Sequence, residues 1–130
     1  MGAVLLDTTV LIDALRGRPA TQRLLGLRAA GDQPYICAVN AEEVRRGLRG
    51  HEQQVARRLL GGLRTVALTM EEGWQAGHWR QRFAAQGTTL SQADCLVAAA
   101  ALAVGARLAT GNPRHFPMSE VAVEYWPVGE

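Results

Sequence analysis

Residues 3–13 read Ala-Val-Leu-Leu-Asp-Thr-Thr-Val-Leu-Ile-Asp, an apolar run followed by an acid, two hydroxyl residues and a second apolar run. The apolar run Ala3–Leu6 is typical of a strand that is buried on both faces. Asp7 ends this run, and the hydroxyls of Thr8 and Thr9 are suited to capping a helix that follows at once. In open α/β sheets the functional crevice lies just beyond the carboxyl ends of the strands. Asp7 is therefore the first candidate site residue.

Strand and helix signals alternate along the rest of the chain. Further strands are expected at residues 34–39, 65–68, 107–109 and 121–126, and helices at residues 8–16, 19–30, 40–48, 51–60, 70–86 and 91–104. Such alternation predicts an α/β fold with a central, mostly parallel sheet of four to five strands, flanked by helices on both faces. The length of 130 residues predicts a single domain over residues 1–130.

Three acidic residues are expected at the carboxyl edge of this sheet. Asp7 follows the first strand, Glu43 lies one turn into the helix after the second, and Asp94 lies one turn into the helix before the fourth. Thr110 and Asn112 follow the fourth strand and add neutral oxygen atoms. Mg²⁺ and Mn²⁺ prefer oxygen ligands, and a shared cation offsets the repulsion between carboxylates. The pattern predicts a divalent-metal site.

Each acid also has a local explanation that competes with the metal site. Residues 40–43 (Asn-Ala-Glu-Glu) and 91–94 (Ser-Gln-Ala-Asp) both resemble capping boxes, in which the last residue bonds back to the backbone of the first. Asp7 could be a simple turn residue after a strand. Asp13 is expected to be a surface or capping residue, and its spacing from Arg16 suits an ion pair on the helix surface.

The composition excludes several kinds of phosphoryl chemistry. All 14 basic residues are arginine, and the net charge is +2. Without lysine, P-loop phosphate binding, Schiff-base catalysis and receiver-type aspartyl phosphorylation are excluded. A haloacid-dehalogenase-like phosphatase built on Asp7 is disfavoured as well, because Thr9 stands where a second aspartate is needed.

The cellular setting follows from the apolar segments. Cys37 and Cys95 lie in such segments and are interpreted as buried thiols in a reducing compartment. The longest apolar run, residues 95–104, has ten residues, too few to span a bilayer. The start of the chain lacks the basic region of a secretory signal. A cytoplasmic protein without membrane contact is expected.

Four motifs, in order, resemble those of one known family. They occupy residues 4–13, 41–47, 91–101 and 108–116, and they contain Asp7, Glu43, Asp94 and the Thr110-Gly111-Asn112 sequence in turn. Together they resemble the VapC toxins, a bacterial branch of the PIN-domain nucleases. The second motif selects Glu43 over Glu42. The chain departs from the family pattern at Thr9, where many relatives carry Asn or Ser, and at Asn112, where some carry a fourth acid.

The resemblance implies a PIN domain that acts as an endoribonuclease dependent on Mg²⁺ or Mn²⁺. Asp7 and Asp94 would be direct metal ligands, and Glu43 a ligand or a general base. Thr8, Thr110 and Asn112 would support the metal and its water. Phosphate contacts are expected from the residues near the motifs, Arg45, Arg46, Arg114 and His115, although each arginine could equally be part of a solvated surface.

The same resemblance implies a biological role. VapC proteins are toxins of type II toxin–antitoxin (VapBC-like) systems that cut structured RNA such as tRNA or rRNA and inhibit translation. They are homodimers that form hetero-oligomers with a small cognate antitoxin. Two alternatives remain open from the sequence: a non-toxic PIN nuclease that processes RNA, and a catalytically silent PIN module that binds RNA or protein.

Overall fold

Five short strands form one parallel sheet at the centre of the molecule. The computed structural model describes residues 2–129. The strands are β1 (Ala3–Leu6), β2 (Gln33–Cys37), β3 (Arg64–Val66), β4 (Arg107–Thr110) and β5 (Val123–Tyr125). Their order is β3-β2-β1-β4-β5, and every neighbouring pair is parallel. The predicted α/β fold is confirmed, with all five strands parallel.

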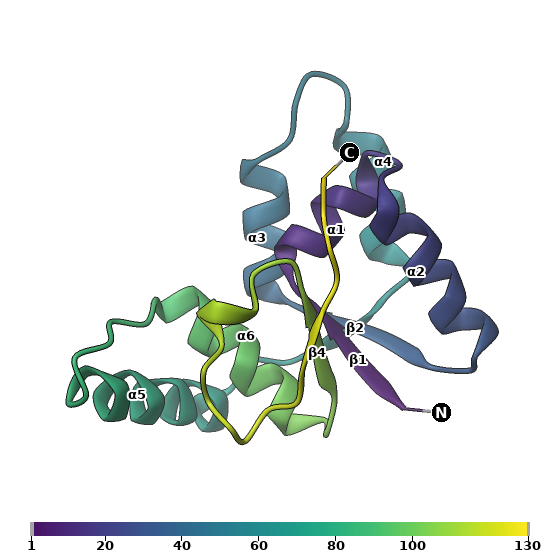
Figure 1. Cartoon of the computed structure of the whole chain (residues 1–130). Helices are drawn as coiled ribbons and strands as arrows, with labels where there is room; N and C mark the ends of the chain where they lie inside the picture. The colour runs from purple at the N-terminus through teal and green to yellow at the C-terminus, as the bar shows by residue number, and fades with distance from the viewer. Residues whose placement is uncertain (1, 130) are drawn as a thin grey trace.

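Helices cover both faces of this sheet (Figure 1). They are α1 (Thr8–Leu15), α2 (Pro19–Ala29), α3 (Ala38–Arg46), α4 (Gln53–Gly61), α5 (Met70–Ala84) and α6 (Gln92–Ala103), with a short 3₁₀ turn, η1, at Pro113–His115. Leu5 packs in a core cluster with residues of α5 and α6, whereas Val4 and Leu6 pack with residues of α1 to α4. Because both faces of β1 are buried, all its inner positions are apolar.

The junction between β2 and α3 lies earlier than predicted. β2 ends at Cys37, which is itself the N-cap of α3, so the predicted N-cap at Asn40 is wrong. Asn40 is the third residue of the helix, and its Oδ1 accepts a hydrogen bond of 2.8 Å from the Cys37 N–H. An asparagine near the start of a helix is the sequence signal of an N-cap. Asn40 gives this signal although it lies inside the helix and bonds to the backbone N–H of the N-cap residue, which explains the error.

Asp13 is buried and does not form the predicted surface pair with Arg16. Only 3% of Asp13 is exposed, and its carboxylate accepts bonds of 2.9 Å from the backbone N–H groups of Ala20 and Gly129. Arg16 instead forms an ion pair of 3.2 Å with Glu52. The prediction was wrong because helix spacing alone ignores the N–H groups at the start of α2, which need acceptors.

The described residues bear on two expectations about the cellular setting. Cys37 and Cys95 are both buried and free, as predicted. Between residues 2 and 129, none of the helices combines the length and the apolar character required to cross a bilayer.

The packing of α5 yields a test of the core. Trp79 is fully buried, whereas Trp74 on the same helix is 81% exposed. Trp79→Ala should lower the free energy of unfolding by about 3–5 kcal/mol, because it leaves a large cavity in the core where α5 packs against α6. Trp74→Ala should change it by no more than about 0.5 kcal/mol. Denaturant unfolding of both variants checks this, and equal losses would contradict the packing.

Candidate functional site

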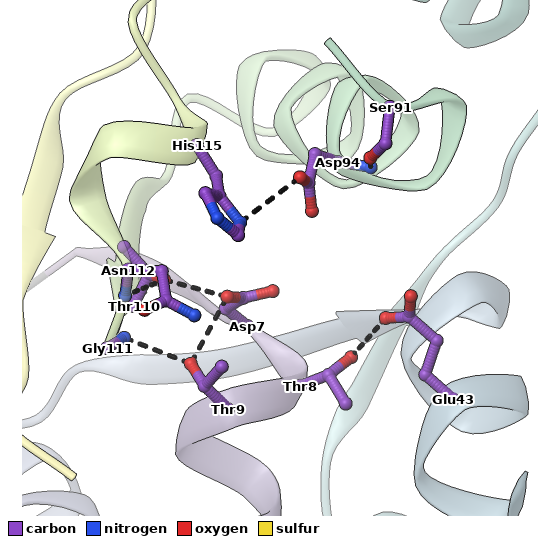
Figure 2. A network of polar contacts seen from close by, with 10 residues as sticks. All are labelled: Asp7, Thr8, Thr9, Glu43, Ser91, Asp94, Thr110, Gly111, Asn112 and His115. Atoms are coloured by element: carbon purple, nitrogen blue, oxygen red, sulfur yellow. Dashed lines mark hydrogen bonds and ion pairs between the residues drawn. The ribbon is translucent and has the colours of Figure 1, made fainter.

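Asp7 is held at the carboxyl edge of the sheet by backbone and side-chain bonds. Its N–H donates to the carbonyl oxygen of Ala109 in β4 at 2.9 Å, which extends the β1–β4 pairing by one residue. Its carboxylate is buried, and Oδ2 accepts hydrogen bonds from the hydroxyls of Thr110 at 2.7 Å and Thr9 at 3.2 Å (Figure 2). This network goes beyond the simple turn role that was the alternative for Asp7.

Each of these hydroxyls is oriented by a backbone N–H of the loop after β4. The Asn112 N–H donates to the Thr110 hydroxyl at 2.9 Å, and the Gly111 N–H donates to the Thr9 hydroxyl at 3.0 Å. A hydroxyl carries a single proton, so accepting these bonds leaves that proton for Asp7. The loop after β4 therefore directs two neutral donors at one carboxylate oxygen.

Asp94 lies in the first turn of α6, close to His115. The Ser91 hydroxyl accepts a hydrogen bond of 3.0 Å from the Asp94 N–H, which confirms Ser91 as the helix cap. The Asp94 carboxylate lies 3.4 Å from Nδ1 of His115, which η1 brings to the site. Capping alone thus does not account for the position of this acid.

Glu43 is held by a chain of polar side chains. The Thr8 hydroxyl donates to Glu43 Oε1 at 2.6 Å, and Nδ2 of Asn40 donates to the Thr8 hydroxyl at 3.2 Å. Because the other end of the Asn40 amide is bonded to Cys37, the whole chain is fixed to the end of β2. Glu43 is no capping residue, so that alternative is wrong.

Asn40 is a site residue that the sequence analysis missed, since it was interpreted as a helix cap. The available signal was its place directly after the apolar Cys37, Ala38 and Val39. A polar side chain in such a buried segment needs partners of its own.

The three acids converge on one edge of the sheet. Figure 2 shows the carboxylates of Asp7, Asp94 and Glu43 around a common space, with His115 on one side. Burial raises the pKa of the Asp7 carboxyl, and the negative charge of Asp94 adds to the rise, while the bond from Thr110 opposes it. Burial also raises the pKa of Asp94; the hydrogen bond with Ser91 and the nearby His115 oppose this rise, and the charge of Glu43 adds a smaller contribution to it.

In this environment the ionised forms of the Asp7 and Asp94 carboxyls are disfavoured. Desolvation and like charges both disfavour ionised carboxylates, and a bound cation would reverse both effects. The donor types, two half-buried or buried carboxylates with a third nearby, suit Mg²⁺ or Mn²⁺.

The side chains are not arranged as a closed metal site. Among residues 2–129, there is no group of three His, Cys, Asp or Glu side chains close enough together to hold one ion. Each acid is bonded to a neighbour instead: Asp7 to Thr110, Asp94 to His115 and Glu43 to Thr8. The two hydroxyl bonds of Asp7 are both made to Oδ2, so an ion that binds Oδ1 leaves them in place.

The remaining predicted residues differ in their exposure and in their side-chain contacts. Asn112 is exposed and belongs to the group in Figure 2. Arg46 forms an ion pair of 3.4 Å with Glu42 along α3, in which both side chains are mostly exposed. Arg45 and Arg114 are exposed. Their contact with RNA stays a prediction.

Comparison with known proteins adds independent information. Residues 4–123 match the family described as PIN domain. Ribonuclease VapC10 of Mycobacterium tuberculosis is 35% identical over 118 residues, which cover 90% of this chain and 88% of that protein. Ribonuclease VapC19 of the same organism is 31% identical over 115 residues, which cover 88% of this chain and 92% of that protein.

A solved structure shows the same arrangement of elements. A toxin–antitoxin complex from Klebsiella pneumoniae contains a chain with a TM-score of 0.74 and 26% identity to this one. The match covers 92% of this chain and 95% of that chain.

The electrostatics of the site yield a prediction for the metal-free protein. Because the pKa of Asp7 lies above its ordinary value of 3.8, its contribution to stability is fully present below that pH and is lost as the pH rises through the raised pKa. Asp94→Asn removes a repelling charge, so it should lower the pKa of Asp7 and raise the melting temperature at pH 7. An NMR titration of Asp7 and thermal unfolding in chelator measure both effects.

Asp32 supplies the control of opposite sign. Its hydrogen bond from Arg107 lowers its pKa, so its contribution to stability is present above pH 3.8 and is lost as the pH falls through the lowered pKa. Asp32→Asn should therefore lower the melting temperature at pH 7. Destabilisation by Asp94→Asn as well would show that Asp94 is no source of repulsion.

Proposed function

Because the chain belongs to the PIN-domain family, in its VapC branch, we propose that it is a divalent-metal-dependent endoribonuclease and the toxin of a toxin–antitoxin pair in the cytoplasm. The observation that carries this proposal is the meeting of Asp7 and Asp94 at one edge of the sheet, each with a raised pKa. The printed names of both curated relatives are ribonucleases. A silent binding module would have no need for these mutually repelling acids.

Asp7 and Asp94 would hold Mg²⁺ or Mn²⁺, with Glu43 as a third ligand or as general base. The bound ion supplies Lewis acidity and neutralises charge at the phosphoryl group. The Thr110 and Thr9 hydroxyls stabilise the ionised form of Asp7, which is the form that binds cations. Asn112, on the exposed side of the same loop, offers a neutral oxygen that would hold water.

As general base, Glu43 would take the proton of the attacking water. Its bond to Thr8 orients the carboxylate toward the site, as general-base catalysis requires. The water oxygen forms a bond to phosphorus, its proton passes to Glu43, and the bond from phosphorus to the ribose 3′ oxygen breaks. That oxygen takes a proton from solvent. The products are a 5′-phosphate and a 3′-hydroxyl, since a water nucleophile does not involve the ribose 2′-hydroxyl.

Structured RNA such as tRNA or rRNA is the proposed substrate. Arg45, Arg46, Arg114 and His115 would contact phosphates at the edge that carries the acids, and such contacts give affinity that depends on salt more than on sequence. The exposed imidazole of His115 lies directly beside Asp94. The fixed shape of this edge favours recognition of folded RNA by its backbone.

The proposed protein partner is a small antitoxin, with the toxin itself a homodimer within the hetero-oligomer. An apolar groove between α3 and α4 offers a place for it, next to the helix that carries Glu43. The groove measures about 170 Å³ and is lined by Ala41, Val44, Arg45, Leu48, Gln53, Ala56, Arg57 and Leu60. The apolar lining with a basic rim suits an amphipathic helix that carries acidic residues.

Two adjacent arginines of α4 test this surface. Arg57 lines the groove, whereas Arg58 does not. Arg57→Glu should weaken binding of the antitoxin by about tenfold through like-charge repulsion at the rim, and Arg58→Glu should leave binding nearly unchanged. Titration of each variant with the small protein encoded beside this gene measures the difference. Equal effects of both substitutions, or the lack of such a neighbouring gene, would contradict the proposed partner site.

Metal removal tests the reaction itself. Cleavage of purified tRNA or rRNA should stop in chelator and return when Mg²⁺ or Mn²⁺ is added. Asp7→Asn should remain folded yet lose at least about a hundredfold in rate with either metal, because a ligand charge is lost. RNA end sequencing should find 5′-phosphates. Cleavage that persists in chelator, or in Asp7→Asn, would point to another chemistry.

A further inference from the structure

We infer that the C-terminal segment 126–129, here called the strap, is a positioning element for the Asp7 carboxylate and that Asp13 is its anchor. The inference rests on the proposed metal site. Figure 1 shows the strap leaving β5 and running alongside α1 toward the C-terminus. It thus lies against the two segments that direct hydroxyls at Asp7: the start of α1 with Thr9, and the end of β4 with Thr110.

The strap contacts the β4 segment first through its backbone. The Trp126 N–H donates to the carbonyl oxygen of Thr110 at 2.8 Å, and the Trp126 ring is buried against the core beneath α1. The same Thr110 donates its hydroxyl to Asp7 at 2.7 Å. One backbone bond from the strap therefore fixes the residue that makes the shortest contact to the Asp7 carboxylate.

The second contact is a close approach at Gly111. A Cβ atom at this residue would lie 2.9 and 3.0 Å from the two methyl carbons of Val128 and 3.3 Å from the Thr9 hydroxyl oxygen. Gly111 therefore passes between the strap and α1 with no room for a side chain. Its N–H donates to the Thr9 hydroxyl at 3.0 Å, so the glycine that Val128 keeps free of a side chain is also the donor that orients Thr9.

Asp13 anchors the far end of the strap. Its buried Oδ1 accepts from the Gly129 N–H and its Oδ2 from the Ala20 N–H, both at 2.9 Å. Gly129 has a φ of 106°, a conformation that favours glycine and that presents this N–H to Asp13. A carboxylate is required here, since an asparagine has a single acceptor oxygen and would leave one of the two N–H groups facing an NH₂.

Both hydroxyl donors to Asp7 are thus supported by the strap, one through Thr110 and one through Gly111. Residues that orient the ligands of a metal affect its affinity by about 10- to 100-fold although they do not touch it. A strap that only stabilised the fold would affect unfolding and leave Mn²⁺ affinity unchanged in the folded protein. This difference separates a positioning role from a structural one.

Two measurements test the inference: calorimetric titration with Mn²⁺ alone gives the metal affinity, and thermal unfolding gives the stability of each variant. The variants are a chain that ends at Trp126, Asp13→Asn, and Val128→Ala as the mildest change. The first two should bind Mn²⁺ about tenfold more weakly than the full chain while folded, and Val128→Ala a few-fold more weakly. Asp32→Asn is the control: it removes the charge that pairs with Arg107 at 3.1 Å, a contact that involves none of the acids of the site, so stability should fall while Mn²⁺ affinity is retained.

A compensating pair makes the test independent of overall stability. Gly111→Ala should weaken Mn²⁺ binding because the added methyl collides with Val128, and Val128→Ala in the same chain should restore most of the affinity by clearing that space. Full Mn²⁺ affinity in the folded chain ending at Trp126, in Asp13→Asn and in Gly111→Ala would overturn the role of the strap.

The proposed function fails in a different way. If the full chain does not bind Mn²⁺, or if Asp7→Asn binds it equally well, the metal site is overturned and the role of the strap with it. If the full chain binds Mn²⁺, Asp7→Asn does not, and every strap variant binds it as tightly as the full chain, only the role of the strap is overturned.

Discussion

Burial of acidic side chains at one edge of the sheet is the constraint around which this molecule is built. The buried β1 delivers Asp7 to that edge, and the first turn of α6 delivers Asp94 opposite it. Burial raises the pKa of both groups. The negative charge of Asp94 adds to the rise at Asp7, and that of Glu43 adds to the rise at Asp94. Holding both ionised at neutral pH requires compensation that the surrounding residues must supply.

The compensation comes mostly from neutral donors. Three threonine hydroxyls serve the acids: Thr9 and Thr110 bond to Asp7, and Thr8 bonds to Glu43. Arginines serve other carboxylates instead. Arg107, Arg16 and Arg82 pair with Asp32, Glu52 and Glu120, and hydrogen bonds from these arginines lower the pKa of each of those carboxyls. These three pairs involve none of the acids of the site, which retain a charge that a cation can neutralise.

Much of this arrangement could be predicted because it is local in sequence. Alternating apolar segments gave the order of strands and helices, and the rule that parallel strands end at a common edge brought Asp7, Glu43 and Asp94 together. The resemblance to VapC proteins chose Glu43 over its neighbour Glu42. Side-chain exposure confirmed the burial of both cysteines.

The contacts that orient the acids could not be predicted, because they join residues far apart in the chain. Asn40 bonds to Thr8 across 32 positions, and Gly111 bonds to Thr9 across 102. A surface or capping role for Asp13 and its helical spacing to Arg16 are visible in sequence, whereas its bond to Gly129 spans 116 positions. Such contacts depend on how the last residues pack against the first helix, which no local pattern encodes.

The most direct measurement of the central claim is anomalous diffraction from crystals grown with Mn²⁺. A single peak within about 2.3 Å of carboxylate oxygens from both Asp7 and Asp94 would establish that these acids share a cation. In that structure the Asp94 carboxylate should have turned away from His115. A peak elsewhere on the protein, with Asp7 and Asp94 still engaged only by Thr110 and His115, would contradict the account.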